Sequence, residues 1–188
     1  MNNLEFIAPE IFVSLSIMFL LILGVFKKNS TNLVHYLSIG FLLITGILTI
    51  NNPLDSSILL FSGSYTVDNL SSFMKILTIL GGAIVLLISR NYLRLFNIFL
   101  IEYPILILCS ILGMMVMISS NDLIIFYVGL ELQSLALYVL ASFKRDQLKS
   151  SESGLKYFVL SALSSGLLLY GCSLIYGFSG STNFNIIS

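Results

Sequence analysis

Charged residues are scarce in this 188-residue chain: 9 Lys and Arg and 9 Asp and Glu make up 10% of the sequence. A soluble domain of this length needs more polar side chains to cover its surface, and here 57% of the residues are hydrophobic. The formal net charge is zero and there is no basic tail, so nothing favours nucleic-acid binding. The composition therefore indicates an integral membrane protein.

Cysteine and histidine are also rare. Cys109 and Cys172 both lie inside apolar runs, where neither a disulfide framework nor a metal site is expected. The single histidine, His35, cannot build a metal cluster. The sequence has no phosphate-binding loop, no nucleophile–histidine pairing and no metal-ligand spacing. We therefore expect no catalytic centre, metal or cofactor in this chain.

Long apolar runs dominate the sequence instead. Runs of about 17–25 mainly apolar residues are long enough to cross a bilayer, and they predict an all-α, polytopic membrane fold with six transmembrane helices. The first run begins almost at Met1 and is interpreted as a retained helix, not a cleaved signal. Polar, turn-forming residues separate the runs. The predicted helices are Phe6–Phe26, Leu33–Ile50, Leu70–Ile88, Tyr103–Ile118, Leu123–Phe143 and Leu155–Phe178.

Basic residues occupy alternate connections between these helices. Seven of the nine fall in connections on one side, and the opposite connections have none. By the positive-inside rule, the basic side faces the cytoplasm or matrix, and both termini face the periplasm or intermembrane space. The remaining two basic residues lie within predicted helices. The seven are Lys27, Lys28, Arg90, Arg94, Lys144, Arg145 and Lys149.

One carboxylate lies where lipid is expected. Glu131 is eight residues into the fifth predicted helix, roughly 12 Å along its axis, near the middle of the bilayer. A charge there costs about 2.5–3.5 kcal/mol, so Glu131 should face protein or water and have a partner. Helical spacing places Tyr127, Ser134, Tyr138 and Ser142 on the same face. This stripe indicates a hydrophilic path for protons or ions; the alternative is helix–helix hydrogen bonding around a structural carboxylate.

The other charged residues near or within helices have simpler interpretations. Lys156 lies one turn into the sixth predicted helix, where its stem can reach the headgroups. Lys75 is expected to be an interface anchor or part of a buried structural pair, and Glu10 to lie at the membrane interface. Asp68 and Asp122 stand at helix starts, where they are expected to be capping residues.

Three blocks of sequence resemble a known family. In order, and with an intramembrane glutamate in the second block, they resemble subunit 2 of complex I, the N-type antiporter-like subunit of proton-pumping NADH:quinone oxidoreductase. The Ser-Glu-x-x-Leu-Lys-Tyr-Phe pattern and the absence of Trp near Glu131 favour this family over related cation/proton antiporter subunits. The blocks are Gly113–Asp122, Gly129–Leu140 and Ser151–Phe158.

The resemblance implies a fold and a function. Residues 1–102 would form three N-terminal helices, and residues 103–188 the start of the first antiporter-like repeat. Glu131 matches the family's fifth-helix glutamate and Lys156 its sixth-helix lysine, both in a charged axis that translocates protons. Tyr127, Ser134 and Tyr138 would orient water beside Glu131, and Lys75 is a weaker charged candidate. The chain would be a non-redox subunit of NADH:ubiquinone reductase, with NADH, FMN, iron–sulfur clusters and quinone in other subunits.

The sequence also departs from the family. Family members continue with a broken seventh helix that bears a key lysine and with a second repeat, whereas this sequence stops at Ser188. We hypothesise a split subunit 2, completed by a separate chain that supplies the remaining helices; a shortened subunit is the alternative.

The expected surroundings follow from the same resemblance. Other membrane-arm subunits of complex I and the lipid bilayer would be the partners. We expect the mitochondrial inner membrane, with the bacterial plasma membrane as the alternative. Two other functions stay open: a subunit of a cation/proton antiporter, and a structural membrane-arm element with no complete proton path.

Overall fold

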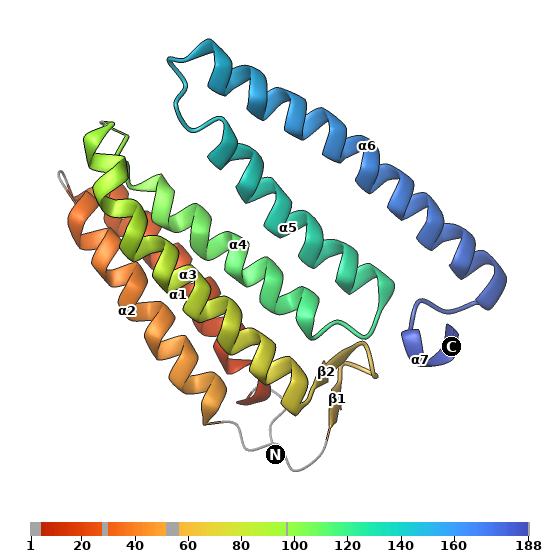
Figure 1. The fold of residues 1–188 in the computed structure, drawn as a ribbon. Helices are drawn as coiled ribbons and strands as arrows, with labels where there is room; N and C mark the ends of the chain where they lie inside the picture. The colour runs from red at the N-terminus through yellow and green to blue at the C-terminus, as the bar shows by residue number, and fades with distance from the viewer. Residues whose placement is uncertain (1–4, 28–29, 52–56, 97, 188) are drawn as a thin grey trace.

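Antiparallel helices and one small β-hairpin make up the computed structural model, which describes residues 5–27, 30–51, 57–96 and 98–187 (Figure 1). The first and last described residues lie at the same end of the molecule, beside the hairpin. The elements are η1 (Glu5–Ile7), α1 (Ala8–Phe26), α2 (Thr31–Ile50), β1 (Ile58–Leu60), β2 (Tyr65–Val67), α3 (Asn69–Leu95), α4 (Glu102–Ile118), α5 (Leu123–Ala141), α6 (Leu148–Ser179) and α7 (Phe184–Ile187).

All six predicted helices are present. By length and composition, five of them can cross a membrane, and α4 is an apolar helix of 17 residues. Two helices are longer than predicted, because α3 continues to Leu95 and α6 begins at Leu148. Hydropathy detects only the apolar part of a helix that lipid surrounds. The backbone hydrogen bonds of α3 and α6 continue beyond it, into the polar and basic residues at their ends.

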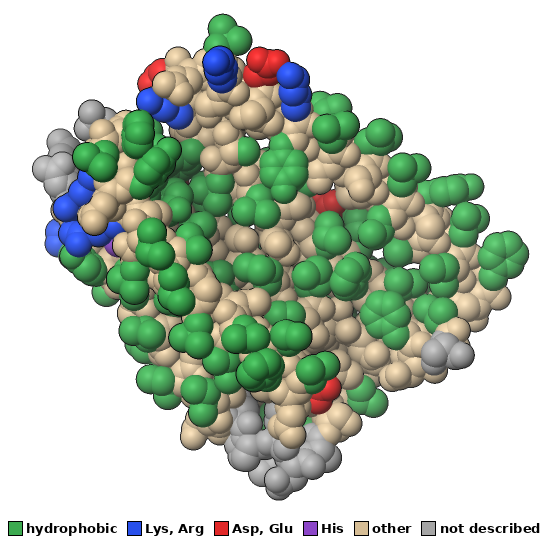
Figure 2. Space-filling model, in the orientation of Figure 1, with side chains coloured by type: hydrophobic (Ala, Val, Ile, Leu, Met, Phe, Trp, Pro, Cys, Tyr) green, Lys and Arg blue, Asp and Glu red, His purple; other side chains and the backbone are tan. Residues whose placement is uncertain are grey.

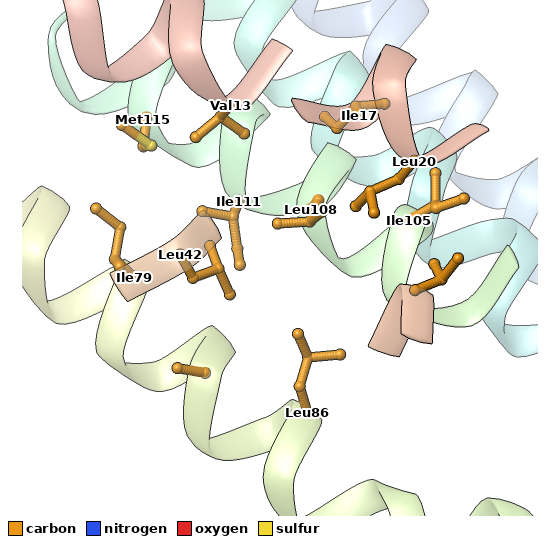
Figure 3. Packing of buried hydrophobic residues seen from close by; sticks show 12 residues of the cluster. Val13, Ile17, Leu20, Leu42, Ile79, Leu86, Ile105, Leu108, Ile111 and Met115 are labelled. Carbon is orange, nitrogen blue, oxygen red and sulfur yellow. The ribbon is translucent and has the colours of Figure 1, made fainter. Parts of the chain in front are cut away.

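Helices α1 to α4 form a group around one apolar core (Figure 3). Each helix contributes side chains three, four or eight residues apart, which places them on one face. The outward faces of these helices carry large exposed apolar residues, as contact with lipid requires. The buried cluster consists of Val13, Ile17, Leu20, Val34, Leu42, Ile79, Ala83, Leu86, Ile105, Leu108, Ile111 and Met115.

Helices α5 and α6 extend this group to one side: α5 packs on α4, and α6 packs on α5 (Figure 1). Two glycines allow α4 and α5 to touch along their backbones. A Cβ atom on Gly129 would lie 2.8 Å from the backbone nitrogen of Met117, and one on Gly113 would lie 2.6 Å from that of Gln133. Small residues permit such close contact between membrane helices. The position of α5, and hence of Glu131, depends on these two glycines.

The all-α prediction holds for nearly all of the described chain, and the connection between the second and third helices contains a short hairpin that was not predicted. β1 pairs with β2 in antiparallel register, with Ile58 opposite Val67. The turn between them has positive φ angles at Phe61, Ser62 and Gly63. Two short runs of β-favouring residues on either side of Ser-Gly-Ser could have indicated a hairpin. A search for long apolar runs does not detect strands of three residues.

Backbone and amide groups tie the hairpin to two distant segments. The backbone nitrogen of Thr66 donates to the Ser119 carbonyl at 2.8 Å, and that of Asn121 donates to the Ser64 carbonyl at 2.9 Å. The Nδ2 atoms of Asn121 and Asn183 both donate to the Gly63 carbonyl, at 2.7 and 2.9 Å. We call this network the polar cap; it consists of the hairpin (58–67), the α4–α5 turn (119–122) and residues 181–184.

Basic side chains gather at the opposite end of the molecule. Lys and Arg atoms lie over the α5–α6 connection and over the end of α3 in Figure 2. The antiparallel order of the helices brings Lys27, Arg90, Arg94, Lys144, Arg145 and Lys149 to this end. Lys28, the seventh residue of the predicted set, lies outside the described residues. The compartment that this basic end faces stays a prediction.

The glycine contact makes a stability prediction. Gly129→Ala places a methyl group against the α4 backbone, so we expect it to destabilise the protein by about 1–3 kcal/mol, the usual range for an overpacked core. Thermal unfolding of the detergent-purified protein measures the effect. Gly166→Ala in α6 is the matched control, because its Cβ would have no neighbour within 4 Å and should leave the midpoint unchanged or slightly higher. Equal midpoints for both variants would contradict the proposed contact.

Candidate functional site

The start of α5 is fixed by Asp122, as predicted. Its Oδ1 accepts a hydrogen bond from the Ile124 backbone nitrogen at 2.8 Å, which caps the helix. Its Oδ2 accepts one from the Thr182 hydroxyl at 2.6 Å, which joins the cap to residues beyond α6. Asp68 caps α3 in the same way, so the capping prediction is confirmed at both positions.

Glu131 lies at the middle of α5, two residues after Gly129. The residue is half-buried, and its Oε1 atom is buried with no hydrogen-bond partner among the described residues. A buried carboxylate oxygen normally has a partner, because loss of hydration costs free energy. The sequence predicts that Glu131 has a partner. Within the described part of the chain, no protein group bonds to its Oε1 atom.

The stripe around Glu131 is only partly connected. Ser134 donates to the main-chain carbonyl of Glu131 at 3.1 Å, and Ser142 donates to that of Tyr138 at 3.2 Å. These are hydrogen bonds within one helix, so the hydroxyls are not used to bind the carboxylate. Tyr127 is half-buried one turn before Glu131. The assignment of Tyr127, Ser134 and Tyr138 to a proton path stays a prediction.

Tyr138 joins α5 to α6. Its hydroxyl and the Ser161 hydroxyl form a hydrogen bond across the two helices. Its ring makes edge contacts with Tyr157 and Phe158, with ring centroids 4.9 and 5.7 Å away. These contacts hold the C-terminal half of α5 against the N-terminal half of α6. Gly154, the buried residue of α6, lies at the same contact, next to Ser142.

Lys156 pairs with Glu152 in the structure, and no ion pair joins it to Glu131 among the described residues. Its Nζ lies 2.5 Å from Oε1 of Glu152, one turn earlier in α6, and its side chain is 67% exposed. Because α6 begins at Leu148, Lys156 stands further into its helix than the sequence predicted. An exposed pair of this kind contributes little to stability, and its functional role stays a prediction.

A second carboxylate and lysine form a buried pair under the polar cap. Lys75 Nζ lies 2.7 Å from Glu10 Oε1, and both side chains are almost fully buried. The Tyr65 hydroxyl donates to the same carboxylate oxygen at 2.8 Å and lies 3.3 Å from Lys75 Nζ. The buried pair expected as one alternative for Lys75 is confirmed, and its partner is Glu10. The depth of Glu10 in the membrane stays a prediction.

Glu10, Tyr65 and Lys75 come from α1, β2 and α3, and their polar atoms lie within hydrogen-bond distance of one another. Burial is the largest factor that raises the pKa of Tyr65 above its usual value, and the nearby Glu10 carboxylate raises it further. Tyr65 therefore stays protonated and donates. Glu10 Oε2 and the Ser119 hydroxyl are both buried without a partner among the described residues.

Sequence reasoning missed the contact between Glu10 and Lys75 because they are far apart in the chain. Each residue lies near the N-terminal end of its own helix, so the shared direction of α1 and α3 in an alternating bundle could have suggested the pair. Tyr65, whose hydroxyl contacts both Glu10 and Lys75, lies in the hairpin that the sequence analysis did not predict.

Comparison with known proteins connects this geometry to a family. A family model described as NADH:quinone oxidoreductase/Mrp antiporter, TM, matches residues 120–188, which hold α5, α6 and Glu131. In respiratory complex I from Thermus thermophilus with bound aureothin, one chain shares the fold with a TM-score of 0.78 and 27% identity, over 93% of this chain and 38% of that one. The chain has an antiporter-like membrane fold. 

A second solved structure supports the same fold. In the Mrp complex from Dietzia sp. DQ12-45-1b, a chain matches with a TM-score of 0.74 and 22% identity, over 96% of this chain and 36% of that one. Sequence similarity is higher to a curated protein: NADH-quinone oxidoreductase subunit N of Pelagibacter ubique is 81% identical over 187 residues. That match covers 100% of this chain and 40% of the relative, so the chain spans about two fifths of the length of the Pelagibacter protein.

The buried pair makes a second prediction. Lys75→Met leaves the Glu10 carboxylate buried without its counter-charge, so we expect a loss of about 3–5 kcal/mol of stability. Lys156→Met breaks a pair of the same two residue types at an exposed site and should cost about 1 kcal/mol or less. Thermal or denaturant unfolding in detergent compares the two variants.

A double variant tests whether pairing is the cause. Glu10→Gln combined with Lys75→Met removes both charges, so it should be more stable than Lys75→Met alone. If the two losses simply add, the Glu10–Lys75 contact does not stabilise the protein.

Proposed function

We propose that this chain is part of a membrane-arm subunit of an NADH-quinone oxidoreductase and takes part in proton translocation. The sequence identity of 81% to subunit N of such an enzyme is the observation that carries the proposal. The chain covers 40% of that relative, so the activity of the complete enzyme is assigned here by proposal. As the sequence predicted, the reaction with NADH and quinone, and the FMN and iron–sulfur clusters, are assigned to other subunits.

Glu131 is the proposed proton-carrying group. It occupies the middle of a helix that has the length and composition to span the bilayer, and its Oε1 atom is buried without a described partner. A carboxylate in a low-dielectric site binds protons more tightly when it loses hydration, and less tightly when a cation approaches. A cation that moves toward or away from Glu131 would therefore switch it between proton release and proton uptake.

The cation is proposed to come from outside the described helices. Lys156 pairs with Glu152 on an exposed face, and Lys75 pairs with Glu10 beneath the polar cap. In the part of the chain that the structure describes, neither lysine forms an ion pair with Glu131. Helices that the relatives have beyond the matched part are the proposed source. The expectation that a separate chain supplies them, as in a split subunit, stays a prediction.

The exposed surface of α6 supports this view of the assembly. Among its 32 residues only Gly154 is buried, and its large apolar side chains point outward. Lipid or further helices can cover such a surface. We propose that other membrane-arm helices cover part of it.

The relatives also bear on location and on the competing function. The named curated relative comes from a bacterium, which favours a bacterial plasma membrane over the mitochondrial inner membrane first expected. The likeness to the Mrp complex, at 22% identity, concerns the fold alone. The antiporter function is therefore the weaker proposal.

Replacement of Glu131 tests the proposed function. In the assembled respiratory complex, Glu131→Gln removes the titratable group and keeps the size of the side chain. We expect NADH-driven proton pumping in reconstituted vesicles to fall by about tenfold or more, because glutamine cannot bind and release a proton at this position. The amount of assembled complex should change little.

Two controls make the result specific. Glu102→Gln removes an exposed carboxylate at the start of α4 and should leave pumping unchanged, and Glu131→Asp should keep part of the activity because it keeps a titratable group. Undiminished pumping in the Glu131→Gln complex would favour a structural role for this carboxylate. A purified complex that contains no redox subunits would favour the antiporter function instead.

A further inference from the structure

A recess opens at the basic end of the molecule, beside the start of α4. It has a volume of about 400 Å³ and is lined by the last turns of α3, the start of α4 and the α5–α6 connection. α4 has 17 residues, about 26 Å of helix, whereas α3 has 27, about 40 Å. The last turns of α3 extend past the start of α4 (Figure 1). The short helix therefore leaves a space between longer neighbours, at the level where the helices leave the bilayer.

The lining of this recess has charge of one sign. Among the described residues that line it, Lys144 is the single charged one, and none is Asp or Glu. Tyr92, Tyr103 and Gln147 add hydrogen-bond donors to the lining. The Ser150 hydroxyl, which also lines the recess, donates to the Ala141 carbonyl. The remaining wall is apolar and aromatic and includes Phe143. The recess therefore combines one cation, several neutral donors and an apolar surface.

Lys144 has no carboxylate partner among the described residues. The ion pairs that the structure records involve Lys75 and Lys156. The Nζ atom of Lys144 lies 5.8 Å from the centroid of the Phe96 ring, a contact that leaves its charge uncompensated.

Two neighbouring recesses differ in this respect, whereas a third, lined by Asn91, Arg94 and Leu95, also holds one basic residue but lacks aromatic walls. One of about 460 Å³ is lined by both Arg145 and Glu102, and another is lined by Arg145, Asp146 and Glu152. Each of these holds charges of both signs, so neither attracts an anion as strongly as the recess at Lys144 does.

We propose that the recess at Lys144 binds one anionic phospholipid. Its phosphate would accept hydrogen bonds from Lys144 and from the neutral donors around it, and an acyl chain would lie along the apolar wall. The position at the end of membrane-spanning helices presents the site to headgroups, and basic pockets between such helices favour anionic lipids. An apolar protein helix in this place would leave the Lys144 charge without a counter-ion, so a lipid is the better match.

Lipid retention tests the proposal. The full chain is extracted from membranes in mild detergent, together with the chains it assembles with, and bound phospholipids are quantified by mass spectrometry through a series of washes. We expect the parent protein to retain phosphatidylglycerol or cardiolipin, and Lys144→Gln to bind it about fivefold more weakly. Lys144→Arg should retain it. Lys149→Gln is the control, because Lys149 is an exposed basic residue at the same end that does not line the recess.

Three outcomes would overturn the proposal: equal retention by Lys144→Gln and the parent, an equal loss from Lys149→Gln, or displacement of the lipid by inorganic phosphate at a matching concentration. A second measurement uses the parent fold, in case the Lys144 variants do not accumulate. A photo-crosslinking residue at Gln147 should label phosphatidylglycerol in preference to phosphatidylcholine in nanodiscs that contain equal amounts of both. Labelling without such a preference would also overturn the proposal.

Discussion

The absence of water from the bilayer core determines how this chain is built. A polar group in that region needs a partner inside the protein, or its burial costs several kcal/mol. Backbone groups meet the requirement within six long helices, and serine and threonine hydroxyls meet it by bonding to carbonyls one turn earlier, as Ser16, Thr45 and Thr49 do. Glu10 and Lys75 meet it through each other and Tyr65. Oε1 of Glu131 is buried without a hydrogen-bond partner in the described chain, as is Oε2 of Glu10.

The two carboxylates differ in the contacts that surround them. Glu10 is almost completely buried, and a lysine and a tyrosine hold its charge in place. These contacts fix α1, α3 and the hairpin to one another. Glu131 lies in a half-buried helix face where the fixed partners are lacking. A group with an incomplete set of partners can respond when a charge nearby moves, which is the property that proton transfer requires.

The parts of the fold that follow from apolar length and helix-end chemistry could be predicted from the sequence. The six helices and the caps at Asp68 and Asp122 belong to this class, because both signals are local. The hairpin could not be predicted by length, since its strands have three residues each. The burial of Glu10 depends on Lys75 and Tyr65, which only the folded chain brings near. The same limit applies to Ser134 and Ser142, whose hydroxyls bond to their own helix and not to Glu131.

The polar cap also sets an order in which the protein can assemble. Its three parts come from residues 58–67, 119–122 and 181–184, so one lies before α3, one before α5 and one after α6. The bonds from Thr182 and Asn183 can form only after α6 has crossed the membrane and returned its end to the side of the hairpin. Until then, the start of α5 lacks part of its anchorage, and α1 to α4 can already hold their own core. Closure of the cap is thus a late event in membrane insertion, and it requires that α5 and α6 both cross the membrane in the correct direction.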